Sequence, residues 1–131
     1  MEVKINNGVA TIPVADPAKS RAFYSSLFGP RRRVWARVAW RDKGDLWRIE
    51  DVSRLRFVRA PANPRRAVEL SLEVPNSSAA WRAALSRGGR GMTPPGMAPW
   101  GRRGFSALDP DRFVVEATEP ERPALARRRA S

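Results

Sequence analysis

Glutamate and tryptophan side chains are the residues of this sequence best suited to contact a ligand. In the segment AVELSLEVPN, residues 67–76, the polar residues Glu69, Ser71 and Glu73 alternate with apolar ones. A strict period of two predicts a strand with one apolar and one polar face. Glu116 lies in another predicted strand near the end of the sequence. We expect the polar faces of these strands to line a cavity.

A carboxylate in a partly enclosed space needs a partner, because leaving its charge unpaired is costly. An internal ion pair with Arg37, Arg56 or Arg102 would satisfy Glu69 and Glu116 in the empty protein. A hydrogen bond to a ligand amine or hydroxyl would satisfy them in a complex. The two alternatives are compatible, since an arginine can yield its place to a ligand.

Tryptophans supply the apolar part of the candidate site. An aromatic face offers offset stacking worth about 0.5–1.5 kcal/mol beyond its buried area. Burial in the core or in a subunit interface is the ordinary alternative for each tryptophan. That alternative is favoured for Trp81, which falls on the apolar stripe of a predicted helix. The predicted ligand-binding residues are Trp35, Arg37, Trp40, Trp47, Glu69, Ser71, Trp100, Arg102 and Glu116.

Composition excludes several classes of site. The 131 residues suit one domain and contain no cysteine and no histidine, which removes the commonest metal ligands and the usual general base. The net charge is +12, with 25 basic against 13 acidic residues. Arginines are scattered, apart from the runs 31–33 and 127–129, and no nucleic-acid recognition motif accompanies them. We therefore expect nucleic acid to bind only non-specifically, through charge.

Nothing in the sequence predicts membrane insertion or export. No apolar run approaches the roughly 20 residues of a membrane span. The first residues, MEVKINNG, lack the apolar core of a signal peptide. We therefore expect a cytoplasmic protein with no membrane contact.

A repeat organises the elements that position these residues. A shift of sixty positions lays Asp16 on Asn76 and Gly29 on Gly89. In each copy a strand precedes a capping Asp or Asn, a helix and a glycine stop, which predicts strand and helix twice. Three further strands are predicted after each helix. The first repeat spans about 8–60 and the second about 67–118, with a linker at 61–66 and a basic tail at 119–131.

Details of the second half follow the same reasoning. The proline-rich segment 92–100 is predicted to be an edge strand that runs into a loop. Asp109-Pro110-Asp111-Arg112 predicts a turn between the last two strands. Each half therefore reads β-α-β-β-β, with four strands per half, one helix on one face and a polar face opposite. The fold class is α+β, with two βαβββ repeats that form curved mixed sheets.

The repeat resembles the vicinal oxygen chelate superfamily, which includes glyoxalase I, the extradiol dioxygenases and the bleomycin-resistance proteins. The motifs that carry the resemblance lie in the family's order and spacing between positions 9 and 118. They are IPVAD (12–16) with AFY (22–24) and FG (28–29), WGRR (100–103), and DPDR (109–112) with VE (115–116). Arg112 stands where the family usually has glycine.

Catalytic members of this family hold a divalent metal at four positions, which map onto Val9, Val58, Glu69 and Glu116. Val58 is placed by laying RLRFVRA (54–60) against RFVVEAT (112–118). Two valines and two glutamates make a poor divalent site, since such a site needs three or four nitrogen or oxygen ligands. The resemblance therefore implies no cofactor and places the chain near the metal-free, antibiotic-binding branch.

Three functions remain open. The resemblance favours a homodimer with clefts at its interface that sequesters a hydrophobic aromatic small molecule, as bleomycin-resistance proteins do. The basic surface favours a neutral or anionic ligand. The alternatives are a metal-dependent lyase, isomerase or dioxygenase that uses Glu69 and Glu116, and a basic module that binds nucleic acid or protein.

Overall fold

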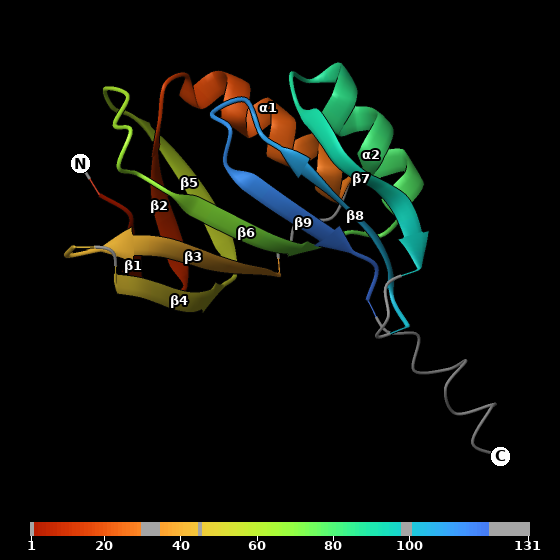
Figure 1. Ribbon diagram of the computed structural model, residues 1–131, viewed down its shortest axis with the longest axis horizontal. Helices are drawn as coiled ribbons and strands as arrows, with labels where there is room; N and C mark the ends of the chain where they lie inside the picture. Colours follow the sequence, from red (N-terminus) through yellow and green to blue (C-terminus); the bar gives the residue numbers. More distant parts are fainter. Residues whose placement is uncertain (1, 30–34, 45, 98–100, 121–131) are drawn as a thin grey trace, which may run out of the picture.

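The computed structural model describes residues 2–29, 35–44, 46–97 and 101–120, and places two helices and nine strands in them (Figure 1). The first half contains β1 (Lys4–Asn6), β2 (Val9–Val14), α1 (Pro17–Phe28), β3 (Ala36–Asp42), β4 (Leu46–Val52) and β5 (Arg54–Arg59). The second half contains β6 (Val68–Glu73), α2 (Ser77–Ser86), β7 (Arg90–Met97), β8 (Arg103–Leu108) and β9 (Val114–Thr118). From β2 onward, both halves follow the predicted order of strand, helix and three strands. The short strand β1 was not predicted, and it pairs antiparallel with β2.

Each helix begins at the polar cap that the sequence predicted. Oδ1 of Asp16 accepts hydrogen bonds from two backbone N–H groups of the first turn of α1, at 3.1 and 3.3 Å. Oδ1 of Asn76 accepts one from the backbone of Ala79 at 2.9 Å. These bonds satisfy donors that the first turn of a helix leaves without partners. No helix in the described part of the chain is long and apolar enough to cross a membrane.

The strands form two sheets, and their division differs from the prediction. One sheet has the order β1-β2-β5, and the other has the order β4-β3-β6-β9-β8-β7. The second half keeps its four strands together, with β6 parallel to β9. In the first half only β2 and β5 stay together, whereas the β3–β4 hairpin pairs with β6 of the second half. The expected four-stranded sheet in the first half is therefore wrong.

The connection between β4 and β5 explains this division. Ser53 alone separates the two strands, whereas a hairpin between neighbouring strands usually needs a loop of about two residues or more. The backbone N–H groups of Ser53 and Arg54 both donate to the carbonyl oxygen of Gly8, at 2.8 and 3.2 Å. The chain is thus held at the start of β2 and continues alongside that strand as β5, instead of folding back on β4.

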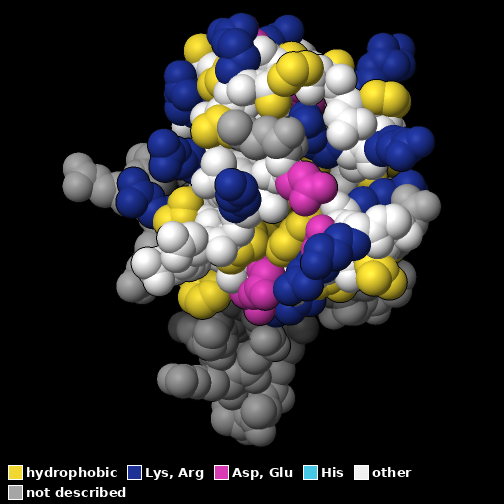
Figure 2. Space-filling view, turned by 90° about the vertical axis from the view of Figure 1, so that its left-hand side faces the viewer, with side chains coloured by type: hydrophobic (Ala, Val, Ile, Leu, Met, Phe, Trp, Pro, Cys, Tyr) yellow, Lys and Arg dark blue, Asp and Glu magenta, His cyan; other side chains and the backbone are white. Residues whose placement is uncertain are grey.

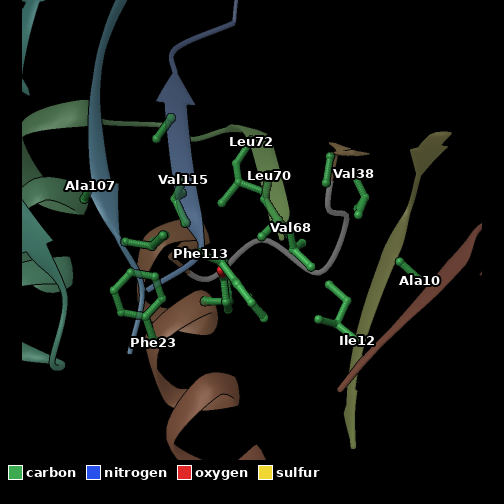
Figure 3. Packing of buried hydrophobic residues seen from close by; sticks show 14 of the residues in the cluster. Ala10, Ile12, Phe23, Val38, Val68, Leu70, Leu72, Ala107, Phe113 and Val115 are labelled. Carbon is green, nitrogen blue, oxygen red and sulfur yellow. The ribbon is translucent and has the colours of Figure 1, made fainter. Parts of the chain in front are cut away.

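The hydrophobic core lies between the helices and the six-stranded sheet. Both helices cover the same face of that sheet (Figure 1). Phe23 of α1, Ile12 of β2 and Leu70 of β6 all belong to this core, which therefore contains side chains from both halves (Figure 3). Trp81 of α2 packs edge-to-face against Phe105, with ring centroids 5.4 Å apart. This contact confirms the packing role predicted for Trp81.

A buried hydrogen-bond network joins the two halves at the turn that starts with Asp109. The hydroxyl of Tyr24 in α1 donates to Oδ2 of Asp109 at 2.6 Å, and Oδ1 accepts the backbone N–H groups of Asp111 and Phe113 at 2.8 and 2.9 Å. Oδ1 of Asp111 accepts the backbone N–H of Ala15 at 2.9 Å. The turn therefore fastens the end of β8 to the beginning of α1.

The same turn contains two unusual residues. Arg112 has a φ of 67°, a left-handed conformation that glycine adopts without steric cost, yet its N–H still donates to the carbonyl of Asp109 at 2.9 Å. Burial raises the pKa of Asp109 to about 6, although hydrogen bonds from Tyr24 and the Phe113 backbone act in the opposite direction. Burial and the nearby Asp109 carboxylate raise the pKa of Tyr24 well above its ordinary value.

Candidate ligand-binding groove

The side of the six-stranded sheet opposite the helices carries the polar side chains, and we call it the outer face. On β6, Glu69 and Ser71 are exposed there, while Leu70 and Leu72 are buried against the helices. The register of β3 with β6 places Arg37 beside Ser71. The alternation predicted for residues 67–76 is therefore confirmed, and it points the polar side chains away from the core.

A groove of about 330 Å³ lies at one end of the outer face. It forms where β3 and β8 begin and where β4, β6 and β9 end. Four of the predicted ligand-binding residues meet in it, namely Trp35, Arg37, Ser71 and Arg102. The other lining residues are Ala36, Asp51, Leu72, Glu73 and Thr118.

Trp35 gives the groove an open aromatic surface. The residue is 60% exposed, so its ring is not part of the core. Its backbone is nevertheless held, because its carbonyl oxygen accepts the N–H of Glu73 at 3.1 Å. An accessible ring on a fixed backbone is well suited to stacking on a planar ligand.

Two arginine–carboxylate pairs line the same groove. Nε of Arg37 donates to Oδ1 of Asp51 at 2.9 Å, and this hydrogen bond raises the pKa of Arg37 further above its ordinary value. A guanidinium nitrogen of Arg102 lies 3.9 Å from a carboxylate oxygen of Glu73. Both pairs are substantially exposed, so they add little to the stability of the fold. A polar ligand can therefore compete for either arginine at small cost.

Asp51, Glu73 and Thr118 were not among the predicted site residues. A signal for Asp51 was present in the sequence, because a hairpin that turns at residues 42–45 sets Arg37 opposite Asp51. The structure has this register. Glu73 lies on the polar face predicted for residues 67–76, so the same alternation indicated it. Thr118 lines the groove because of how the strand ends meet, and no local pattern predicts that.

Glu69 and Glu116 lie on the outer face but do not line the groove. Their strands are parallel neighbours, and Glu116 pairs with Ser71 while Glu69 pairs with Val114. Both glutamates are exposed, and neither forms a salt bridge with a described residue. The expected internal ion pairs with Arg37, Arg56 or Arg102 are therefore wrong. Arg37 binds Asp51, Arg102 lies beside Glu73, and no salt bridge joins Arg56 to either glutamate in the described part of the chain. The two carboxylates are exposed to solvent and not enclosed, so neither needs a protein partner.

The remaining predicted tryptophans lie elsewhere. Trp47 is on β4, where the guanidinium carbon of Arg41 lies 5.4 Å from its ring centroid. The prediction that Trp40 binds the ligand is wrong. Trp40 is 7% exposed and belongs to the core, because its position in β3 alternates with the outer-face residues. Trp100 lies outside the described residues.

Trp40 also borders a larger hollow of about 690 Å³ at the far end of β3. The β3–β4 turn and the linker before β6 form its walls, and they contribute Arg41, Lys43, Arg65 and Arg66. Figure 2 views the molecule from this end and shows Lys and Arg side chains scattered among hydrophobic and other atoms, with a few Asp and Glu side chains near the middle. The hollow is thus distinct from the groove and has a different charge balance.

Sequence comparison assigns the chain to a family. The model of the Glyoxalase/Bleomycin resistance protein/Dioxygenase superfamily matches residues 7–117. The chain belongs to this superfamily. A search among curated proteins finds no match.

Solved structures of the superfamily share the fold at low sequence identity. A glyoxalase/bleomycin resistance protein from Albidiferax ferrireducens is 16% identical, with a TM-score of 0.55 over 86% of this chain and 96% of that one. A family enzyme from Burkholderia phytofirmans is also 16% identical, with a TM-score of 0.53 over 86% and 96%. Glyoxalase I from Zea mays is 17% identical, with a TM-score of 0.52 over 86% of this chain and 45% of that one. These likenesses show the fold alone.

The metal positions expected in the superfamily do not assemble a suitable donor set here. Val9 lies on the three-stranded sheet, whereas Glu69 and Glu116 lie on the six-stranded sheet. The register also changes the fourth position: Arg56 pairs with Thr11 as Glu116 pairs with Ser71, so Arg56 and not Val58 is the counterpart of Glu116. Among the described residues, no group of three or more His, Cys, Asp and Glu side chains is placed to hold a metal ion. Two carboxylates, a valine and an arginine do not fit a divalent site of this family.

Proposed function

We propose that this protein binds a planar aromatic small molecule in the outer-face groove and holds it without altering it. The observation that carries the proposal is the groove itself, in which an exposed tryptophan stands beside two arginines that are held only by surface ion pairs. The ring of Trp35 supplies stacking, and the guanidinium groups of Arg37 and Arg102 supply hydrogen bonds to a polar substituent.

The charges around the groove favour a ligand that is neutral or anionic. Arg37 uses Nε for Asp51, and its guanidinium group has further N–H donors to offer a ligand. The net charge of +12 attracts anions to the surface as a whole. An aromatic acid or a quinone-like ring system combines a planar face with acceptor oxygens, and both match what the groove offers.

The side chains available as metal ligands favour sequestration over metal-dependent catalysis. A metal-dependent lyase, isomerase or dioxygenase would use Glu69 and Glu116, but these lie outside the groove and have no third carboxylate, imidazole or thiolate beside them in the described residues. Tight binding without reaction protects a cell when the ligand is an antibiotic or another toxic compound. These features support the proposal that the protein binds its ligand without a metal-dependent reaction.

Intrinsic tryptophan fluorescence tests the proposal directly. Titration with naphthoate and with anthraquinone sulfonate should quench the exposed Trp35, and a ligand at saturation should raise the melting temperature. Recovery of the compound unchanged after incubation would support binding without chemistry. No quenching and no thermal shift with any planar neutral or anionic compound would overturn the proposal.

A further inference from the structure

The hollow at the far end of β3 is lined by more positive than negative side chains, and we call it the basic hollow. Its lining contains the two carboxylates of Glu2 and Asp42. Four cations accompany them, two from the β3–β4 turn and two from the linker before β6, namely Arg41, Lys43, Arg65 and Arg66. In the groove, by contrast, two arginines face two carboxylates. The basic hollow therefore carries an excess of positive charge that the groove lacks.

One of the two carboxylates is engaged by a further arginine. Oδ2 of Asp42 lies 3.8 Å from a guanidinium nitrogen of Arg48. Arg48 lies on β4 opposite Trp40 and is not part of the lining. The pair offsets the negative charge of Asp42, so the hollow attracts anions more strongly than the charges of its lining alone would indicate.

Backbone hydrogen bonds hold both walls of the basic hollow, which lie at the same end of the molecule (Figure 1). The N–H of Arg41 donates to the carbonyl oxygen of Ala67 at 3.3 Å and so joins the turn to the linker. Within the linker, the side-chain Oδ1 of Asn63 accepts the N–H of Arg65, and the backbone carbonyl of Asn63 accepts that of Arg66, both at 3.0 Å. The backbones of these arginines are therefore in place before a ligand arrives, which lowers the entropic cost of binding.

Two of the guanidinium groups are oriented as well. Arg66 donates to the carbonyl oxygens of Pro13 and Pro61, at 3.3 and 3.4 Å. These acceptors are neutral, so the two bonds orient the guanidinium group and add no negative charge. The guanidinium carbon of Arg41 lies 5.4 Å from the ring centroid of Trp47, a cation–π contact that likewise preserves the positive charge. Oriented arginines suit phosphate recognition, because their planar fork of N–H groups matches phosphate oxygens.

We propose that the basic hollow binds a small molecule that carries a di- or triphosphate group. A single phosphate monoester carries a charge of about −1.5 to −2 at pH 7 and three strong acceptor oxygens, so it matches only part of the four cations. The volume of about 690 Å³ lies within the roughly 300–1,000 Å³ of small-molecule sites and leaves room for an organic group beside the phosphates. An organic phosphate ester and a free polyphosphate share this chemistry and differ only in the organic group.

The lining favours a small molecule over a nucleic acid. Sites for single strands combine a positively charged groove with aromatic side chains on which successive bases stack. Among the described residues that line the hollow, Trp40 is the one aromatic residue, and only 7% of it is exposed. The hollow therefore offers charge and hydrogen bonds to phosphates without the stacking surface that a single strand uses.

The phosphate site is separate from the proposed aromatic site. The described residues that line the basic hollow and those that line the groove have no member in common. The two lie at opposite ends of β3, with the groove at Trp35 and Arg37 and the hollow at Trp40 and Arg41. Phosphate binding therefore depends on no ligand in the groove.

Isothermal calorimetry with tripolyphosphate, ATP and adenosine tests the site. At about 0.15 M salt, where charges more than roughly 8 Å apart are largely screened, tripolyphosphate and ATP should each bind with one equivalent per chain. Adenosine should not bind. Tighter binding of ATP than of tripolyphosphate would identify an organic phosphate as the ligand class, and the reverse would identify a free polyphosphate. Absence of binding by both phosphates, or adenosine that binds as tightly as ATP, overturns the proposal.

Removal of one cation from each wall should weaken binding. The double variant Lys43→Gln with Arg65→Gln should weaken ATP binding by about tenfold or more, because charge-assisted hydrogen bonds are the strong ones. Glu2→Gln should strengthen it, since it removes a negative charge from the lining. The matched control, Arg82→Gln with Arg87→Gln, makes the same change in net charge at exposed positions on α2 and at its C-cap. Equal weakening in the two double variants would show attraction by surface charge alone and overturn the site.

Backbone amide signals locate the site in the wild-type protein, without any variant. In two-dimensional NMR spectra, saturating ATP should shift the signals of residues 41–44 and 65–67 and leave those of α2 unchanged. Trp35→Ala should bind ATP as the wild type does. Shifts centred on Arg37 and Ser71 in the groove, or spread evenly over the basic surface, overturn the assignment. A single-stranded oligonucleotide that displaces ATP and binds more tightly overturns it in favour of nucleic acid.

Discussion

The hydroxyl of Tyr24 in the first repeat donates a 2.6 Å hydrogen bond to the buried carboxylate of Asp109 in the second repeat. Asp109 is 3% exposed, so this bond satisfies an oxygen that water does not reach. The bond also fixes the turn between β8 and β9 against α1. The relative placement of the two halves, on which the groove depends, therefore includes a polar contact as well as the core.

Removing that hydroxyl should destabilise the fold. Tyr24→Phe leaves Oδ2 of Asp109 without its donor, and an unsatisfied buried polar group costs about 1–3 kcal/mol. Urea denaturation at pH 7 should show a loss of this size. The loss should be smaller near pH 4.5, where Asp109 is protonated in the folded protein. An unchanged midpoint at both pH values would contradict the role assigned to the bond.

Asp109 should make stability depend on pH in a defined window. Its folded-state pKa of about 6 lies above the ordinary 3.8, so the folded protein binds this proton more tightly than the unfolded chain. The contribution of Asp109 to folding stability is therefore fully present below the ordinary pKa and is lost as the pH rises through the folded-state pKa. The pKa shift corresponds to a change on the order of 3 kcal/mol in the free energy of unfolding.

Asp109→Asn isolates this contribution. The free energy of unfolding of the wild type, minus that of this variant, should be largest near pH 4 and should decrease toward pH 7. Denaturant titrations at four or five pH values measure the difference. A difference that does not change with pH would show that Asp109 titrates normally.

Trp35 should carry much of the affinity for a planar ligand. Trp35→Ala removes the stacking surface and should weaken binding about tenfold, which corresponds to the upper part of the stacking range. Isothermal calorimetry measures the affinity without relying on the fluorescence of the deleted ring. Trp81→Phe changes a tryptophan that packs on Phe105 and should bind the ligand as the wild type does.

Metal content distinguishes binding from the metal-dependent alternative. The donor set predicts that purified protein retains less than one equivalent of zinc, nickel, iron or manganese, by elemental analysis. Glu116→Ala should leave that content and the ligand affinity unchanged, because Glu116 lies outside the groove. Stoichiometric metal that disappears in Glu116→Ala would favour a metal-dependent enzyme.

Two glycines on β7 provide a matched test of packing. A Cβ atom at Gly91 would overlap Cη2 of Trp81, whereas one at Gly96 would meet nothing closer than the Pro94 carbonyl oxygen at 3.9 Å. Gly91→Ala should therefore lower the melting temperature, because the Trp81 ring has to shift to make room. Gly96→Ala should lower it much less. Equal melting temperatures for the two variants would contradict the placement of Trp81.

The sequence by itself determined the features that depend on neighbouring residues. The hydrophobic period, the caps at Asp16 and Asn76 and the turn at residues 109–112 each act over a few positions. Local physics therefore predicted both helices, the strands from β2 onward and their order, but not the short strand β1. The same alternation predicted that Glu69 and Ser71 lie on the face of β6 that points away from the core. The internal repeat then indicated the superfamily.

Only the tertiary structure decided which strands are neighbours. Backbone hydrogen bonds hold Ser53 at Gly8, which is 45 positions away in the sequence. The bend at Ser53 therefore directs β5 to β2 and leaves β3 and β4 to pair with β6. This pairing brings Trp35, Asp51 and Glu73 into one groove. It also removes Val9 from the sheet that carries Glu69 and Glu116, and makes Arg56 the counterpart of Glu116. Contacts between distant segments depend on how whole elements pack, and no period or motif within one strand encodes that.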